Sequence, residues 1–139
     1  MRMIGNERLM RRGAAALFAL AAAALWMSSV AAAELVMFRR DGCPWCEAWD
    51  REIGPIYGKT DLGRRAPLRM VNMPRDRAEV ALKSPIIYTP TFVLVDNGRE
   101  VARIEGYAGD HFFWGLVEGL LERLPPGSPG ARSAAPLGQ

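Results

Sequence analysis

The sequence predicts an α/β domain in which helices flank a four-stranded mixed β-sheet, in the element order βαβαββα. Two observations carry this prediction. Short apolar runs of strand length alternate with segments of helical periodicity, and a tight-turn signal between two such runs marks a hairpin before the last helix. The two cysteines of the chain lie where the first strand gives way to the first helix, and they indicate the chemistry of the domain.

The first three elements are expected to form a βαβ unit. Residues 34–39 contain a continuous apolar run, which is typical of a strand covered on both faces. The next helix begins near Pro44, which suits the first helical position, and it kinks or ends at Gly54 and Pro55. Its apolar stripe consists of Trp45, Trp49, Ile53 and Tyr57. A right-handed crossover then leads to a second strand at residues 68–73.

The remaining elements complete the sheet and place helices on both of its faces. Residues 76–83 are expected to form a short helix, and residues 91–95 a buried strand. Residues 96–99 form a tight turn that leads into the hairpin partner at residues 100–105. The last helix starts with Asp110 as its N-cap. Its buried stripe consists of Phe113, Leu116, Val117, Leu120, Leu121 and Leu124.

The two ends of the chain have a different character from the domain at residues 34–124. Residues 1–33 combine a basic start, an apolar run and three alanines before Glu34, which is the signature of a secretory signal peptide. This predicts export to the periplasm. The alternative is an uncleaved leader that anchors the protein in the inner membrane. Residues 125–139 are rich in Pro, Gly, Ser and Ala, and we expect a disordered tail.

Charge argues against a nucleic-acid partner. The chain has 18 basic and 15 acidic residues, and residues 1–33 hold four of the arginines and one of the glutamates. Cleavage after Ala33 would leave 106 residues with 14 charges of each sign. The basic character therefore belongs to the leader, and the mature domain lacks the positive surface that nucleic-acid binding requires.

Cys43 and Cys46 enclose Pro44 and Trp45 at the start of the first predicted helix. A thiolate at a helix N-terminus is stabilised by unpaired N–H groups and by the helix dipole. Because the thiolate is the attacking species in thiol–disulfide exchange, Cys43 at the exposed helix start is the candidate nucleophile. Cys46 would attack the resulting mixed disulfide and leave a Cys43–Cys46 disulfide. Trp45 is expected to contact the partner.

Other readings of the two cysteines are weaker. A structural disulfide that closes so short a loop removes little entropy from the unfolded chain. Zinc requires about four ligands, and His111 is the other conventional candidate. No histidine follows Cys46, so the haem-attachment pattern is missing. We therefore predict a redox-active pair that needs no metal and no organic cofactor.

These features together resemble the thioredoxin superfamily. The resemblance rests on the element order, on the Cys-X-X-Cys after the first strand, and on Thr89 and Pro90 at the start of a later strand. More narrowly, residues 41–49, 88–92 and 105–114 are similar to the SoxS-type periplasmic thioredoxins of bacterial sulfur-oxidation systems.

The resemblance assigns roles to residues outside the cysteine pair. It implies that Pro90 is a cis-proline facing the cysteines, that Thr89 offers backbone hydrogen bonds to a bound peptide, and that Gly106 lies near the peptide groove. Pro44 and Trp45 join this substrate-binding set. The chain also departs from the family, because Met37 stands where thioredoxins keep a buried aspartate that accepts the proton of the inner cysteine. Deprotonation would then need another route, such as Glu47 or water.

The function that the resemblance implies is that of a monomeric, periplasmic thiol–disulfide oxidoreductase. It would act as a protein-disulfide reductase that keeps the cysteine of a sulfur-carrier protein reduced, with electrons from a membrane thiol transporter. The alternatives are a folding oxidase that donates its disulfide and a docking module without catalysis. The direction of electron flow between this protein and its partner depends on the redox potential and on upstream partners. A thiol peroxidase is a still weaker candidate function, because the chain lacks an obvious peroxide-site pattern.

Overall fold

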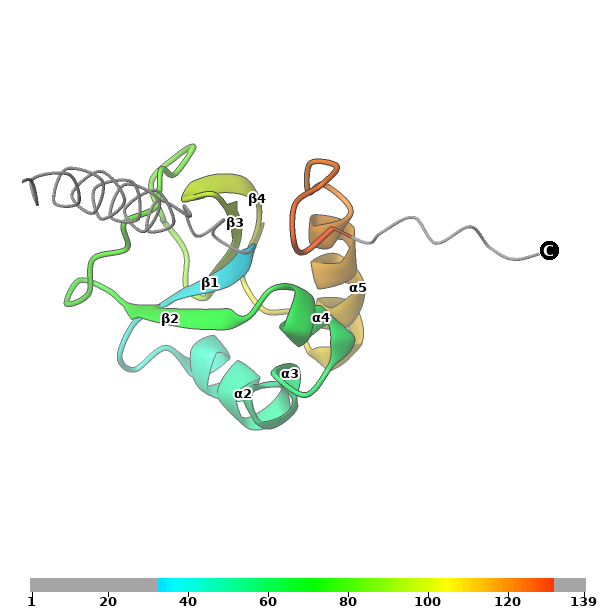
Figure 1. Ribbon diagram of the computed structural model, residues 1–139. Coiled ribbons are helices and arrows are strands. Elements are labelled where there is room, and N and C mark those ends of the chain that lie inside the picture. The colour runs from blue at the N-terminus through cyan, green and yellow to red at the C-terminus, as the bar shows by residue number, and fades with distance from the viewer. Residues whose placement is uncertain (1–32, 132–139) are drawn as a thin grey trace, which may run out of the picture. The chain divides into compact units, whose positions relative to one another are not determined.

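The computed structural model describes residues 33–131, which form a mixed four-stranded sheet with flanking helices (Figure 1). The strands are β1 (Glu34–Arg39), β2 (Leu68–Asn72), β3 (Thr91–Asp96) and β4 (Arg99–Glu105), in the spatial order β2-β1-β3-β4. β1 is parallel to β2 and antiparallel to β3, which in turn is antiparallel to β4. The predicted fold class is therefore confirmed.

Four helices connect or follow these strands. They are α2 (Pro44–Glu52), α3 (Gly54–Tyr57), α4 (Asp61–Arg65) and α5 (Asp110–Leu121). The break between α2 and α3 lies where the sequence predicts it, because Pro55 has no N–H to continue the α2 ladder. None of the helices within residues 33–131 is long and apolar enough to span a membrane.

The main core lies between the sheet and the helices. Alternate side chains of β1 and β3 point to this side, because successive residues of a strand face opposite ways. Trp49 of α2 is fully buried there, with its ring centre 5.6 Å from that of Phe92 and 5.8 Å from that of Phe113. The helix that carries the cysteines is thus fixed to the sheet by a large aromatic side chain.

The helix predicted at residues 76–83 is wrong, and with it the prediction of helices on both faces. After β2 the carboxylate of Asp76 accepts the N–H of Asn72 and turns the chain back. The following segment is extended, and its alternate residues Ala78, Val80 and Leu82 pack on the second face of the sheet. They cover a smaller core made of Val36, Phe38, Val71, Val93 and Val95. Packing thus overrides the helix propensity of this segment.

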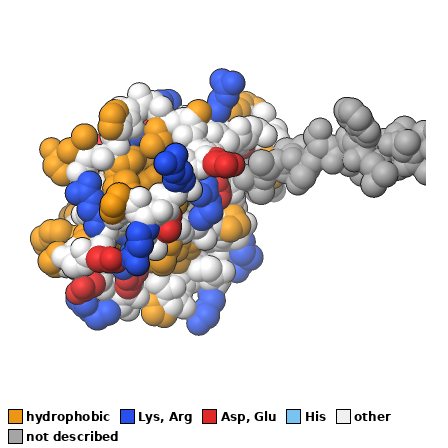
Figure 2. Space-filling view, turned by 90° about the vertical axis from the view of Figure 1, so that its left-hand side faces the viewer, with side chains coloured by type: hydrophobic (Ala, Val, Ile, Leu, Met, Phe, Trp, Pro, Cys, Tyr) orange, Lys and Arg blue, Asp and Glu red, His pale blue; other side chains and the backbone are white. Residues whose placement is uncertain are grey.

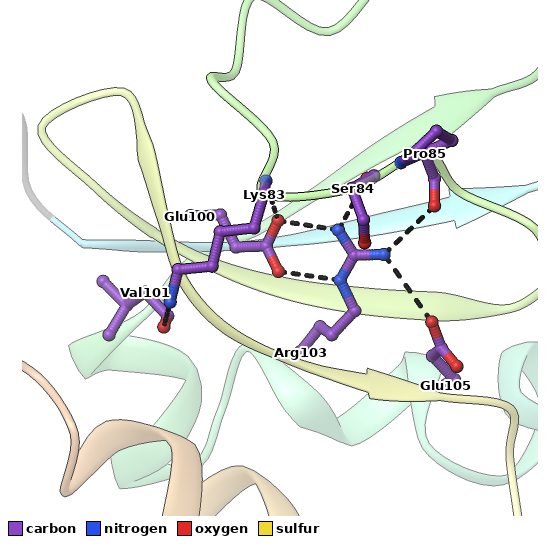
Figure 3. Close-up of polar contacts among 7 residues, drawn as sticks. All are labelled: Lys83, Ser84, Pro85, Glu100, Val101, Arg103 and Glu105. Atoms are coloured by element: carbon purple, nitrogen blue, oxygen red, sulfur yellow. Dashed lines mark hydrogen bonds and ion pairs between the residues drawn. The ribbon is translucent and has the colours of Figure 1, made fainter.

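A buried ion pair ties the extended segment to β4 (Figure 3). The guanidinium of Arg103 donates from Nε and from a terminal nitrogen to the two carboxylate oxygens of Glu100, both at 2.7 Å. The Glu100 carboxylate also accepts the backbone N–H of Lys83 at 2.8 Å, and Arg103 donates to the carbonyls of Ser84 and Pro85 at 2.9 and 3.3 Å. The side chains of Glu100 and Arg103 are only 2% and 13% exposed.

The last helix differs in two details from its prediction. Gly109, not Asp110, is the N-cap, and Asp110 is the first helical residue, whose carboxylate accepts the N–H of His111. Leu116 was expected in the buried stripe but is 48% exposed. The reason is that the stripe is narrow, with Phe113 and Val117 facing the core one turn apart.

Packing continues beyond Leu124, where the sequence predicted the end of the domain. The carbonyl of Gly130 accepts the Nε–H of Arg65 at 2.9 Å, and the hydroxyl of Ser128 donates to the buried Asp96 at 2.9 Å. Ala131 packs against the main core. The rest of the predicted tail and residues 1–32 of the predicted signal peptide lie outside the described residues.

The Glu100–Arg103 pair should make stability depend on pH. Hydrogen bonds from Arg103, and next from the backbone N–H of Lys83, hold the pKa of Glu100 below its ordinary value of about 4.5. A lowered carboxylate pKa stabilises the folded state above that ordinary value, and this stabilisation is lost as pH falls through the lowered pKa. We expect Glu100→Gln to cost about 1–3 kcal/mol at neutral pH and progressively less below pH about 4. Urea unfolding of both proteins across this range measures the difference, and a difference independent of pH would contradict the expectation.

Candidate functional site

The two cysteines lie at the turn from β1 to α2. The loop after Arg39 passes through Gly42, whose φ of +68° favours glycine, and it ends at Cys43, the N-cap of α2. Pro44 is the first helical residue, as predicted. Cys43 and Cys46 form a disulfide, with their Cα atoms 5.3 Å apart.

The helix N-terminus points at the sulfur of Cys43. The backbone N–H of Cys46 donates to Cys43 Sγ at 3.2 Å, which is the capping interaction of α2. When the disulfide is reduced, the same N–H and the dipole of the helix favour negative charge on this sulfur. The capping geometry therefore supplies a reason for Cys43 to be the nucleophile.

Burial distinguishes the two sulfurs. Cys43 is 9% exposed, whereas Cys46 is fully buried in the main core. Met37 belongs to the same core cluster as Cys46. The Glu47 carboxylate belongs to an exposed residue of the first turn of α2. Of the two cysteines, Cys43 is therefore the one that keeps some exposure to a partner in solution.

A second segment, at the start of β3, faces the disulfide. The peptide bond between Thr89 and Pro90 is cis, and the carbonyl oxygen of Thr89 lies 3.4 Å from Cys43 Sγ. Pro90 is buried, and its carbonyl accepts the N–H of Gly106 at 2.7 Å. Gly106 itself has a φ of +85° and follows directly on β4. Cys43, Thr89, Pro90 and Gly106, far apart in the sequence, are thus brought together.

A groove runs beside Cys43. It has a volume of about 410 Å³ and is lined by Trp45, Tyr88, Thr89, Glu105 and Gly106. Trp45 is 62% exposed and Tyr88 60%, so two aromatic rings stand open to solvent at this site. Figure 2 views the end of the domain that holds the turn from β1 to α2, where hydrophobic side chains are interspersed with Lys and Arg.

Sequence reasoning missed two of these lining residues, Tyr88 and Glu105. The apolar residues Ile86, Ile87 and Tyr88, outside any strand and directly before Thr89, were an available signal. Ile86 packs on the smaller core, whereas Ile87 is 61% exposed. Glu105 gave no such signal, because a charged residue at the end of a strand is ordinarily a solvated one.

A tyrosine fixes the loop after Gly106 to α2. Tyr107 is buried against Phe113, and its hydroxyl donates to the carboxylate of Glu52 at 2.5 Å. Burial, followed by this contact with Glu52, raises the pKa of Tyr107 well above its ordinary value, so the phenol stays protonated. One wall of the groove is thereby anchored to the helix that carries the cysteines.

Comparison with known proteins identifies the fold family. The periplasmic thioredoxin SoxS from Paracoccus pantotrophus, in its reduced form, is 40% identical and matches with a TM-score of 0.63, over 66% of this chain and 97% of that chain. The chain belongs to the thioredoxin superfamily. No family model and no curated protein sequence matches it.

Two more distant structures are also similar to the chain. Malassezia sympodialis thioredoxin is 22% identical, with a TM-score of 0.48 over 63% of this chain and 74% of that one. A thioredoxin-fold protein from Helicobacter pylori is also 22% identical, with a TM-score of 0.44 over 62% of this chain and 66% of that one.

The protein is a thioredoxin-like redox protein with a Cys-X-X-Cys disulfide. Within residues 33–131 no three His, Cys, Asp or Glu side chains gather closely enough to hold a metal ion. The groups available for chemistry at this site are the two sulfurs and the backbone groups around them.

Alkylation of the reduced protein should separate the two cysteines. Because Cys43 is accessible and capped by an N–H, we expect iodoacetamide at neutral pH to modify Cys43 before Cys46 is modified at all. Peptide mass spectrometry at early times reads the two sites directly. Equal modification of both cysteines in the folded protein would contradict the asymmetry.

Proposed function

We propose that this thioredoxin-like domain is a protein-disulfide reductase. The observation that carries the proposal is the partly exposed Cys43, whose sulfur is capped by the N–H of Cys46 and which lies beside a groove with exposed aromatic residues. A reactive sulfur in such a groove suits a peptide-borne disulfide better than a small metabolite, because the site is an open surface depression.

The reaction follows from the positions of the two sulfurs. The Cys43 thiolate attacks one sulfur of the partner's disulfide, which breaks and releases the other sulfur as a thiolate. Cys46 then loses its proton to water or to Glu47 and attacks Cys43 Sγ. The second partner sulfur leaves as a thiolate, and the Cys43–Cys46 disulfide forms. Two electrons have passed to the partner, and a dithiol donor must return them.

The groove supplies positions for the partner chain. The backbone of Thr89 is available for hydrogen bonds to an extended peptide, because its carbonyl faces Cys43 and no helix or strand includes it. Gly106 lines the groove next to it and is joined to the buried Pro90 by a hydrogen bond. Pro44 and Trp45 flank the nucleophile, and the exposed ring of Trp45 offers apolar contact.

The likeness to SoxS extends the proposal to location and partner. We infer a periplasmic, monomeric protein exported by residues 1–33, with an uncleaved leader as the alternative. The partner would be a sulfur-carrier protein of a sulfur-oxidation system, whose cysteine is kept reduced. A membrane thiol transporter would supply the electrons. No metal or organic cofactor enters this scheme.

Trapping in the exporting cell tests the function. The Cys46→Ser protein should stop at the mixed disulfide, so Cys43 stays bonded to its partner and mass spectrometry identifies both linked cysteines. The double variant with Cys43→Ser as well should trap nothing. One dominant sulfur carrier would support the proposal, whereas many unrelated secreted proteins would favour a folding oxidase.

Equilibration with a glutathione buffer supplies the direction of electron flow. A reductase predicts a reduction potential below about −200 mV, whereas a value near −120 mV is typical of a strongly oxidising couple and would refute the reductase role. Full biological activity of Cys43→Ser would instead favour a docking module.

A further inference from the structure

We propose that Arg103 is a positioning residue for the substrate groove, acting through the segment that carries Tyr88 and Thr89. The inference rests on the proposed function, since it concerns how the same groove receives a peptide. Arg103 belongs to β4 and is absent from the lining of the groove, so neither its place in the sequence nor its exposure draws attention to it.

The wall formed by residues 87–89 has little support of its own. It belongs to no helix or strand, and Ile87 and Tyr88 point largely into solvent. On its C-terminal side the Thr91 hydroxyl donates to the carbonyl of Tyr88 at 2.8 Å. On its N-terminal side the wall depends on how residues 83–86 are held.

Arg103 provides that hold. As Figure 3 shows, its guanidinium reaches the carbonyls of Ser84 and Pro85 while it is bonded twice to Glu100, which in turn takes the N–H of Lys83. The planar guanidinium is suited to bind a carboxylate and two carbonyls at once, which a lysine ammonium cannot copy. Residues 83–85 are therefore fixed to β4 by this ion pair, together with the hydrogen bond from the Lys83 ammonium to the carbonyl of Val101 at 2.5 Å.

The same guanidinium also contacts a residue that lines the groove. Its Nη1 lies 3.6 Å from a carboxylate oxygen of Glu105, and Glu105 lines the groove next to Gly106. The Glu105 side chain is 45% exposed, so it remains open to a partner on its other side. Arg103 thus contacts both the segment that leads to Tyr88 and a second residue of the groove lining, Glu105, and it couples their positions.

Burial makes this arrangement rigid. The pair is almost fully removed from water, and removal of one partner alone would leave an uncompensated buried charge. The hydrogen bond with Glu100 also raises the pKa of Arg103, so the guanidinium stays charged at every pH at which the protein is folded. None of these contacts involves a cysteine, so we expect Arg103 to affect the groove far more than the reactivity of Cys43, which it can reach only through the Thr89 carbonyl.

The test compares two disulfides with the same leaving group. Reduced protein is mixed in single-turnover experiments with dithiobisnitrobenzoate, which needs no groove, and with an extended peptide whose cysteine carries thionitrobenzoate. In both reactions the Cys43 thiolate displaces thionitrobenzoate, whose absorbance gives the second-order rate constant. We expect Arg103→Gln to lower the peptide rate about tenfold and to leave the small-reagent rate within about twofold.

A matched control is Arg69→Gln. Arg69 makes the same two-pronged contact with Glu34, but between the second residue of β2 and the first residue of β1, at the end of β1 opposite to the cysteines. Its loss should leave the ratio of the two rates unchanged. An unchanged ratio in folded Arg103→Gln would overturn the proposal, and so would an equal fall in both variants.

A second variant covers the case in which Arg103→Gln does not fold. In Glu100→Met with Arg103→Met, both charges are replaced by apolar side chains, an exchange that buried ion pairs often tolerate. The hydrogen bonds to Ser84 and Pro85 are still lost, so the same fall in the rate ratio is expected.

The assay needs only thiol–disulfide exchange in one direction. A protein that exchanges with the peptide but fails to turn over protein disulfides would therefore contradict the reductase function and leave the positioning role standing.

Discussion

The site depends on one capping interaction, the donation of the Cys46 N–H to the sulfur of Cys43. It requires that β1 end where α2 begins, that the loop between them pass through a left-handed glycine, and that α2 be fixed in place by Trp49. The sheet and the aromatic core thus serve to hold a helix N-terminus against a sulfur atom. The same arrangement leaves Cys46 one turn further along, inside the core, where only Cys43 can present it with a disulfide to attack.

The groove beside Cys43 is formed mainly by residues from the second half of the domain. Thr89 and Gly106 reach the disulfide because β3 lies beside β1 and because the N–H of Gly106 binds the carbonyl of Pro90. Where a helix was expected, this chain covers the second face of its sheet with an extended segment that has few internal hydrogen bonds. A backbone bridge between Ala81 and Arg99 holds the middle of this segment, and the buried pair of Glu100 and Arg103 adds a polar anchor at residues 83–85.

Much of this could be predicted from the sequence, and the failures have physical causes. The strands and the cysteine helix were predictable because apolar runs, a proline at the helix start and an Asn-Gly turn each act locally. The segment at residues 76–83 was not, because alanine, leucine, glutamate and lysine favour a helix while the alternation of Ala78, Val80 and Leu82 fits a sheet surface. The position of Glu105 in the groove lining could not be predicted from the sequence, because it depends on which strand end lies beside Thr89. Such pairings are set by tertiary contacts between residues far apart in sequence.

The central claim is that helix capping makes the Cys43 sulfur an anion at the pH where the protein works. The most direct measurement is the ultraviolet absorbance of the thiolate in reduced Cys46→Ser protein as pH is raised. The capping N–H belongs to the backbone and survives that substitution, so the thiolate should appear well below the value of about 8.5 that is typical of free cysteine. Ionisation at or above that value in the folded protein would contradict the claim.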